Sequence, residues 1–155
     1  MTALNLELKI PPVIVAVIFI VLMWVLAVLL PGVETSNLFR FGAYVVLMVA
    51  GAVYSVAGVV SFKKANTTVN PIRPGASSVL VTTGIYKSSR NPMYLGFLFF
   101  LIGWGLFLSN LYSLALCAGF VLYMNRFQIQ PEEKALESAF GAEFLAYKER
   151  VRRWF

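Results

Sequence analysis

The chain has 155 residues, of which 59% are hydrophobic, and its formal net charge is +6. Soluble domains are nearer to 45–50% apolar, so this composition, with a mean hydropathy of +0.78, indicates an integral membrane protein. There is no histidine, no aspartate and a single cysteine, Cys117. This composition excludes an intrachain disulfide, haem ligation through histidine, most zinc sites and Ser-His or Cys-His nucleophiles, and we expect no metal.

Two long apolar stretches in the first half of the chain predict transmembrane helices. Residues 12–30 carry no charge and are long enough to cross a hydrocarbon core of about 30 Å. Residues 38–62 contain one charge, Arg40, near their start, where a long side chain can reach the interface. Gly51 and Gly58 lie on one face of this second helix and would let a neighbouring helix approach closely.

A polar segment, residues 63–91, separates these helices from two further apolar stretches. A connection of this length is usually functional or disordered, and the β-branched residues in 79–83 argue that it is ordered. Residues 92–108 and 111–127 predict a third and a fourth transmembrane helix. The two polar residues between them predict a tight hairpin.

The last segment, residues 131–155, predicts an amphipathic helix that Gly141 kinks or divides. Its apolar residues recur at steps of three or four, and its basic residues suit the phosphates of a membrane surface. The periodic apolar positions are Leu136, Phe140, Phe144, Tyr147, Val151 and Trp154.

The basic residues predict the orientation. With four spans, Lys9, the five cations of the 63–91 segment and the six from Arg126 onward share one side, and only Arg40 falls on the other. The positive-inside rule then makes both termini cytoplasmic and explains the basic charge without nucleic acid. The expected fold is a single all-α, multi-pass membrane domain over residues 1–155, with four transmembrane helices and an amphipathic C-terminal surface helix.

Two polar clusters lie where the predicted third and fourth helices meet the cytoplasm. In the first, Arg90 and Asn91 directly precede Pro92, which suits the first turn of a helix, with Asn91 as its cap. The second is the pair Glu132-Glu133 just beyond the fourth helix. Taken alone, the glutamates complement a helix dipole and Arg90 anchors the topology. The predicted hairpin places both clusters at one end, where they can share a site.

Together these segments resemble a known family. VTTGIYKSSRNPMYLG, the later Glu-Glu pair and FGAEFLAYKERVRRW are similar to motifs of the isoprenylcysteine carboxyl methyltransferase and phospholipid methyltransferase superfamily of membrane enzymes. That family shows Gly-x-Tyr, Arg-His-Pro-x-Tyr-x-Gly, Glu-Glu and an FG-x-E-Y-x-x-Y segment. The resemblance covers residues 79–154. It implies an S-adenosylmethionine-dependent methyltransferase whose active site faces the cytoplasm and whose acceptor is lipidic or lipid-soluble.

The resemblance also implies roles for individual residues. The chemistry of this cofactor makes Arg90 and Glu133 the candidate catalytic residues: Arg90, or the N–H groups after Asn91, suits the carboxylate of the cofactor, and Glu133 suits the removal of a proton from an amine acceptor. Glu132 and Glu133 suit the cofactor's ammonium group, and Tyr86 or Tyr94 its adenine. The cofactor-binding residues implied are Ser78, Val79, Leu80, Val81, Tyr86, Asn91, Pro92, Met93, Tyr94 and Glu132.

Two departures from the isoprenylcysteine motif leave the acceptor open. Asn91 stands where the isoprenylcysteine enzymes have histidine, whereas phospholipid N-methyltransferases resemble this chain in having asparagine there. Gln128 stands where the isoprenylcysteine enzymes place an arginine for the substrate carboxylate. The nearest cation is Arg126, so Arg126 and Gln128 are the candidate substrate-binding residues. A phospholipid amine N-methyltransferase, or a membrane assembly protein that keeps the fold without the activity, remains an alternative.

Overall fold

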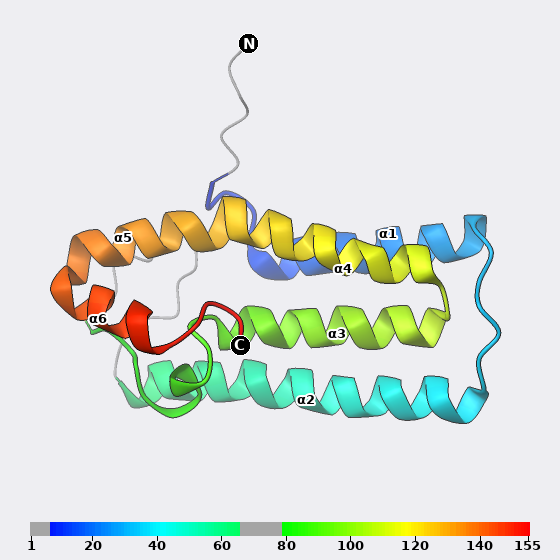
Figure 1. Ribbon diagram of the computed structural model, residues 1–155, viewed down its shortest axis with the longest axis horizontal. Helices are drawn as coiled ribbons and strands as arrows, with labels where there is room; N and C mark the ends of the chain where they lie inside the picture. The colour runs from blue at the N-terminus through cyan, green and yellow to red at the C-terminus, as the bar shows by residue number, and fades with distance from the viewer. Residues whose placement is uncertain (1–6, 66–78) are drawn as a thin grey trace, which may run out of the picture.

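The computed structural model describes residues 7–65 and 79–155, and in these two ranges the chain forms helices and no strand. Figure 1 shows α1 to α4 running side by side, with α5 continuing in nearly the same line as α4. The all-α prediction is confirmed. The elements are α1 (Pro12–Leu29), α2 (Asn37–Lys64), η2 (Gly84–Lys87), α3 (Pro92–Leu108), α4 (Leu111–Met124), η3 (Asn125–Ile129), α5 (Gln130–Phe140) and α6 (Ala142–Arg150).

The membrane character is visible in α1 and α2, which are both long and apolar enough to cross a bilayer. The outer face of α2 carries a row of valines, and Val45, Val49 and Val53 are each more than half exposed. In water such a row would be unfavourable, whereas hydrocarbon accepts it at no cost. Helix α3 is also apolar but shorter.

Small residues bring α2 and α3 into close contact. A Cβ atom built at Gly96 of α3 would clash with the Ser55 hydroxyl and would lie 2.7 Å from the carbonyl oxygen of Gly51. A Cβ atom built at Gly58 would likewise clash with the side chain of Met93. The predicted packing role of Gly51 and Gly58 is confirmed, because the backbones of two membrane helices approach this closely only at small residues.

The predicted turn between the third and fourth helices is present, and Asn110 stabilises it. Its Oδ1 accepts a hydrogen bond of 2.9 Å from the Ser113 backbone N–H, which caps α4, while its Nδ2 donates to the carbonyls of Leu30 and Pro31 at 3.1 and 3.2 Å. One buried amide therefore joins the start of α4 to the end of α1. Ser109, before it, has a left-handed backbone with φ of 51°.

Arg40 makes more specific contacts than a side chain that only extends toward an interface. Its Nε and Nη2 donate to the Phe107 carbonyl at 2.9 and 2.6 Å, and its guanidinium lies over the Phe107 ring. A cation here satisfies the last carbonyls of α3 and complements the negative end of its dipole. Arg40 therefore helps to fix α2 against α3.

The C-terminal segment differs from the predicted surface helix. Gly141 adopts a positive φ of 50° and divides the segment into α5 and α6, and residues 151–155 follow without a helix. The apolar side of α6 packs on the protein, where Phe144 is 1% exposed and the Tyr147 hydroxyl donates to the Tyr86 carbonyl at 2.7 Å. These residues complete the protein core, so they are not available to lie in a membrane surface.

Candidate functional site

A compact polar cluster forms where α3, η3 and α5 meet. Tyr94, in the first turn of α3, donates its hydroxyl proton to Glu132 Oε1 at 2.5 Å. Gln128, one turn before Glu132, donates its Nε2–H to the same oxygen at 2.9 Å. The spacing of four residues places Gln128 and Glu132 on one helix face, so η3 and α5 present both side chains toward α3.

The second carboxylate oxygen of Glu132 has a different environment. It accepts no hydrogen bond from the residues that the structure describes, and the Glu132 side chain is partly exposed. Burial of the carboxyl group raises the pKa of Glu132 to about 7, against the opposing effect of the bonds from Tyr94 and Gln128. Glu132 can thus hold or release a proton near neutral pH, and Oε2 keeps its capacity to accept a hydrogen bond.

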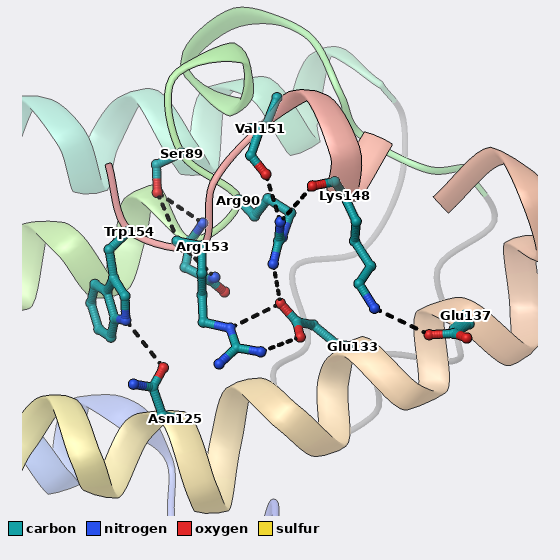
Figure 2. Close-up of polar contacts among 10 residues, drawn as sticks. Ser89, Arg90, Asn125, Glu133, Glu137, Lys148, Val151, Arg153 and Trp154 are labelled. Carbon is teal, nitrogen blue, oxygen red and sulfur yellow. Dashed lines mark hydrogen bonds and ion pairs between the residues drawn. The ribbon is translucent and has the colours of Figure 1, made fainter. Parts of the chain in front are cut away.

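Glu133, the next residue, belongs to a separate network (Figure 2). Arg90 Nη2 donates to Glu133 Oε1 at 2.8 Å, and Arg153 donates from Nε and Nη2 to the two carboxylate oxygens at 3.1 and 2.6 Å. Burial opposes ionisation, but the two guanidinium groups hold the pKa of Glu133 below its ordinary value. A carboxylate paired in this way is a weak proton acceptor.

Arg90 also binds the end of α6 through Nη1, while its buried Nε has no hydrogen-bond partner among the described residues. Nη1 donates to the carbonyls of Lys148 and Val151 at 3.1 and 2.5 Å, in the region drawn in Figure 2. Asn91 occupies the cap position of α3 as expected, yet its side chain makes no capping hydrogen bond. Its Nδ2 donates instead to the Arg153 carbonyl at 3.0 Å.

Tyr86 lies close to this site. Its side chain is 6% exposed, its ring packs edge-on against Phe62 with the centroids 5.4 Å apart, and its carbonyl receives the Tyr147 hydroxyl. Burial raises the pKa of Tyr86, and the nearby Tyr147 and Glu132 add to the shift, so its hydroxyl stays protonated. Tyr86 is therefore a neutral and buried aromatic side chain beside the site.

The remaining predicted residues divide into two groups. Pro92 is buried at the start of α3, Met93 packs on α2, and Val79, Leu80 and Val81 form the extended approach to η2. Arg126 is directed elsewhere, since its Nη1 pairs with Glu7 Oε1 at 2.5 Å on the surface. The structure thus brings Gln128 to Glu132 and leaves Arg126 apart, while Ser78 lies outside the described residues.

Arg153 and Asn125 are site residues that the sequence reasoning missed. The sequence predicts that the basic tail lies on the membrane surface, whereas Arg153 pairs with Glu133. Asn125 Oδ1 accepts the indole N–H of Trp154 at 3.1 Å. Tyr147 carried a usable signal, because it falls on the last position of the FG-x-E-Y-x-x-Y motif. Nothing local in the sequence marked Arg153 or Asn125.

The fold and site define an all-α membrane protein with a titratable carboxyl site at one end of its helices. The family model described as phospholipid methyltransferase matches residues 39–143, more than half of the chain, so the protein belongs to the phospholipid methyltransferase family. Within the described ranges, no group of three or more His, Cys, Asp or Glu side chains is placed to hold a metal ion.

Several individual proteins are also similar to this chain in sequence. Protein-S-isoprenylcysteine O-methyltransferase of Saccharomyces cerevisiae is 43% identical over 76 residues, which are 47% of this chain and 30% of the relative. Protein-S-isoprenylcysteine O-methyltransferase A of Arabidopsis thaliana is 30% identical over 128 residues, 80% of this chain and 62% of the relative. An uncharacterized protein of Haemophilus influenzae is 47% identical over 62 residues, 40% of this chain and 98% of the relative.

The chain therefore spans less than two thirds of the length of these two named methyltransferases. No solved structure matches the chain significantly.

Proposed function

We propose that the protein transfers a methyl group from S-adenosylmethionine to a membrane-dissolved acceptor. The observation that carries the proposal is the carboxyl group of Glu132, fixed by Tyr94 and Gln128 through one oxygen and open at the other. A partly buried carboxylate with one open oxygen is suited to a ligand cation. The family membership and the named relatives support the reaction class.

S-adenosylmethionine carries a sulfonium, an ammonium, a carboxylate and an adenine, and the site offers groups suited to the ammonium and the adenine. Glu132 would hold the ammonium through Oε2, and Tyr86 or Tyr94 would lie against the adenine. The bound cofactor supplies an electrophilic methyl group. The protein's own task is then to exclude water and to orient the acceptor, because the positive charge of the donor is neutralised as the methyl group leaves.

We propose a framework role for Arg90 and Glu133 in place of the catalytic role expected from the sequence. Arg90 has hydrogen bonds to Glu133 and to two carbonyls, and Glu133 accepts from two arginines. Glu133 would have to give up these charge-assisted bonds before it could take a proton, and Arg90 would have to give them up before Nη1 or Nη2 could contact a ligand. Glu132, with its pKa of about 7, is the better proton acceptor.

Methylation of an amine acceptor is a second candidate, and the charge distribution favours it over methylation of a carboxylate. Gln128 occupies the position beside Glu132, and the nearby Arg90 and Arg153 are paired with Glu133. Neither Arg90 nor Arg153 is therefore free for a substrate carboxylate. An amine acceptor needs no such cation, although it must lose a proton before it attacks.

For the membrane arrangement we propose four spans, with both termini and the site on the cytoplasmic side. The apolar character of α1, α2 and α3 supports it, as does the return of the chain through α4. The π-helix η3 and α5 continue α4 beyond the start of α3 (Figure 1), which would carry Glu132 toward the cytoplasmic interface.

Two measurements test the proposal together. Calorimetry on the purified protein in lipid nanodiscs should detect binding of S-adenosylmethionine and of its demethylated product with similar affinity, since most contacts are to unreacting parts. Lipid mass spectrometry after incubation with methyl-labelled cofactor should then identify the acceptor. Folded protein that binds neither ligand would refute the enzyme proposal and favour a non-catalytic assembly protein. Protein that binds the cofactor but forms no methylated product with any membrane extract would refute the proposed catalysis.

A further inference from the structure

We propose that residues 151–155 form a brace that sets the separation of α3 and α5, and that Arg153 is a positioning residue for Glu132. The inference rests on the proposed function only for its consequence in ligand binding. Its structural content is that one short, non-helical segment bonds to both elements that hold the Tyr94–Glu132 pair.

On the α3 side, the brace is held through its backbone. The Arg90 N–H donates to the Arg152 carbonyl at 3.0 Å. Asn91 Nδ2 and Ser89 Oγ donate to the Arg153 carbonyl at 3.0 and 3.3 Å. These contacts come from the three residues directly before α3, three to five positions ahead of Tyr94. The brace therefore follows any movement of the N-terminal end of α3.

On the other side, the brace is held through its side chains, as Figure 2 shows. The Arg153 guanidinium reaches both oxygens of Glu133 on α5, and the Trp154 indole donates to Asn125 on η3. A guanidinium that meets both carboxylate oxygens fixes direction as well as distance. Asn125 and Glu133 thus bracket the stretch that carries Gln128 and Glu132.

The consequence concerns the helix that carries Glu132. Glu133 is its immediate neighbour, so fixing Glu133 to Arg153 fixes the rotation of α5 about its axis. The Tyr94–Glu132 bond, at 2.5 Å, tolerates little change in that rotation or in the distance to α3. Arg90 links Glu133 to the same end of α3, but it leaves Glu133 Oε2 to Arg153. The side chain of Arg153 is therefore expected to control how Glu132 faces a ligand.

The chain offers a matched control for Arg153. The neighbouring Arg152 is exposed, and its side chain makes no hydrogen bond or ion pair with any residue that the structure describes. Arg152→Gln and Arg153→Gln change the net charge equally, and only the second removes the contact with Glu133. A third variant, Arg153→Lys, keeps the charge and loses the planar fork.

The first test needs no cofactor. In a background in which Cys117 is replaced by alanine, spin labels at Lys87 and Ser138, both exposed, report the distance between the loop before α3 and α5. We expect a narrow distance distribution in the parent protein and in Arg152→Gln, and a broad or displaced one in Arg153→Gln. An unchanged distribution in Arg153→Gln would overturn the brace, whatever the protein binds.

The second test uses S-adenosylhomocysteine as the probe in nanodiscs. We expect its dissociation constant to rise roughly tenfold in Arg153→Gln, the factor for the loss of one charge-assisted bond between the ligand and Glu132, with partial recovery in Arg153→Lys and no change in Arg152→Gln. Equal affinity in all variants would refute the positioning role. If the parent protein binds no probe, the proposed function fails, while the distance measurement still decides the brace.

Discussion

Tyr94 and Glu132 are 38 positions apart in the sequence and are joined by a hydrogen bond of 2.5 Å between the phenol and the carboxyl group. The bond links the first turn of α3 to the first turn of α5. It restrains one carboxylate oxygen and leaves the other open, so that the acid is oriented and can still bind a ligand. The predictions below follow mainly from this pair and from the packing that supports it.

Replacement of Glu132 by glutamine should weaken cofactor binding strongly. The change keeps the size of the side chain and removes its charge, and a charge-assisted hydrogen bond contributes about 1.5–3 kcal/mol. The dissociation constant should rise roughly ten- to a hundredfold, measured by calorimetry. Glu143→Gln, at an exposed position of α6, is the charge-matched control and should bind normally. Normal binding by Glu132→Gln would mean that the acid only complements a helix dipole.

Cofactor affinity should also depend on pH. Because the pKa of Glu132 is raised to about 7, the carboxyl is protonated at pH 6, and a ligand ammonium must first displace that proton. Affinity should therefore increase by up to about tenfold per pH unit below 7 and level off above it. The slope should vanish in Glu132→Gln, measured by titrations in matched buffers.

The stability of the ligand-free protein should change with pH in the opposite direction. A raised pKa in the folded state contributes stability that is fully present below the ordinary value near 4.5 and is lost as the pH rises through about 7. The Glu132 contribution to the melting temperature should therefore fall over this window. A melting curve for Glu132→Gln that keeps the same pH dependence would contradict this assignment.

Removal of the Tyr94 hydroxyl should act through Glu132. In Tyr94→Phe the carboxylate loses a donor that stabilises its charged form, so the midpoint of the pH dependence should move upward. At neutral pH we expect affinity to fall several-fold, which corresponds to a contribution of about 1 kcal/mol. Tyr112→Phe, at an exposed position of α4, is the control. An unshifted midpoint in Tyr94→Phe would show that the bond does not control the acid.

Gly96→Ala should destabilise the contact between α2 and α3. The added methyl group would lie 2.7 Å from the Gly51 carbonyl oxygen, and overpacking of this kind costs typically about 1–3 kcal/mol. Gly42→Ala is the matched control, because nothing lies within 4 Å of its added Cβ atom. Thermal unfolding in detergent should separate the two variants. Equal melting temperatures would mean that the helices can move apart without cost.

The orientation proposal predicts which positions a membrane-impermeant thiol reagent can reach. In the background with Cys117 replaced by alanine, a cysteine at Ser138 of α5 should react only from the cytoplasmic side. A cysteine at Glu34, in the connection between α1 and α2, should react only from the opposite side. Both positions are exposed. Labelling of Ser138 from outside would separate the site from cytoplasmic cofactor and contradict the proposed function.

The helices themselves were predictable from the sequence, because their signals are local. Apolar stretches predicted α1, α2 and α3 within a few residues, and Ser109 and Asn110 predicted the turn before α4. Gly141 predicted the division between α5 and α6. Each depends on backbone preference or on the local density of apolar side chains. The small residues of α2 were likewise predicted to pack closely, since glycine has few other uses in such a helix.

The roles of the charged residues were decided by tertiary structure. From the sequence alone, Arg90 is interpreted as a topology anchor, Glu133 as a partner of a helix dipole and Arg153 as a cation at the membrane surface. Nothing in these three interpretations connects the residues with one another. The fold brings the three together and pairs them, while leaving one oxygen of Glu132 open. An ion pair forms between whichever opposite charges the chain path brings within a few ångströms. The sequence alone thus determined where the helices are and how apolar they are, and only the folded structure decided which of two adjacent glutamates remains open to a ligand.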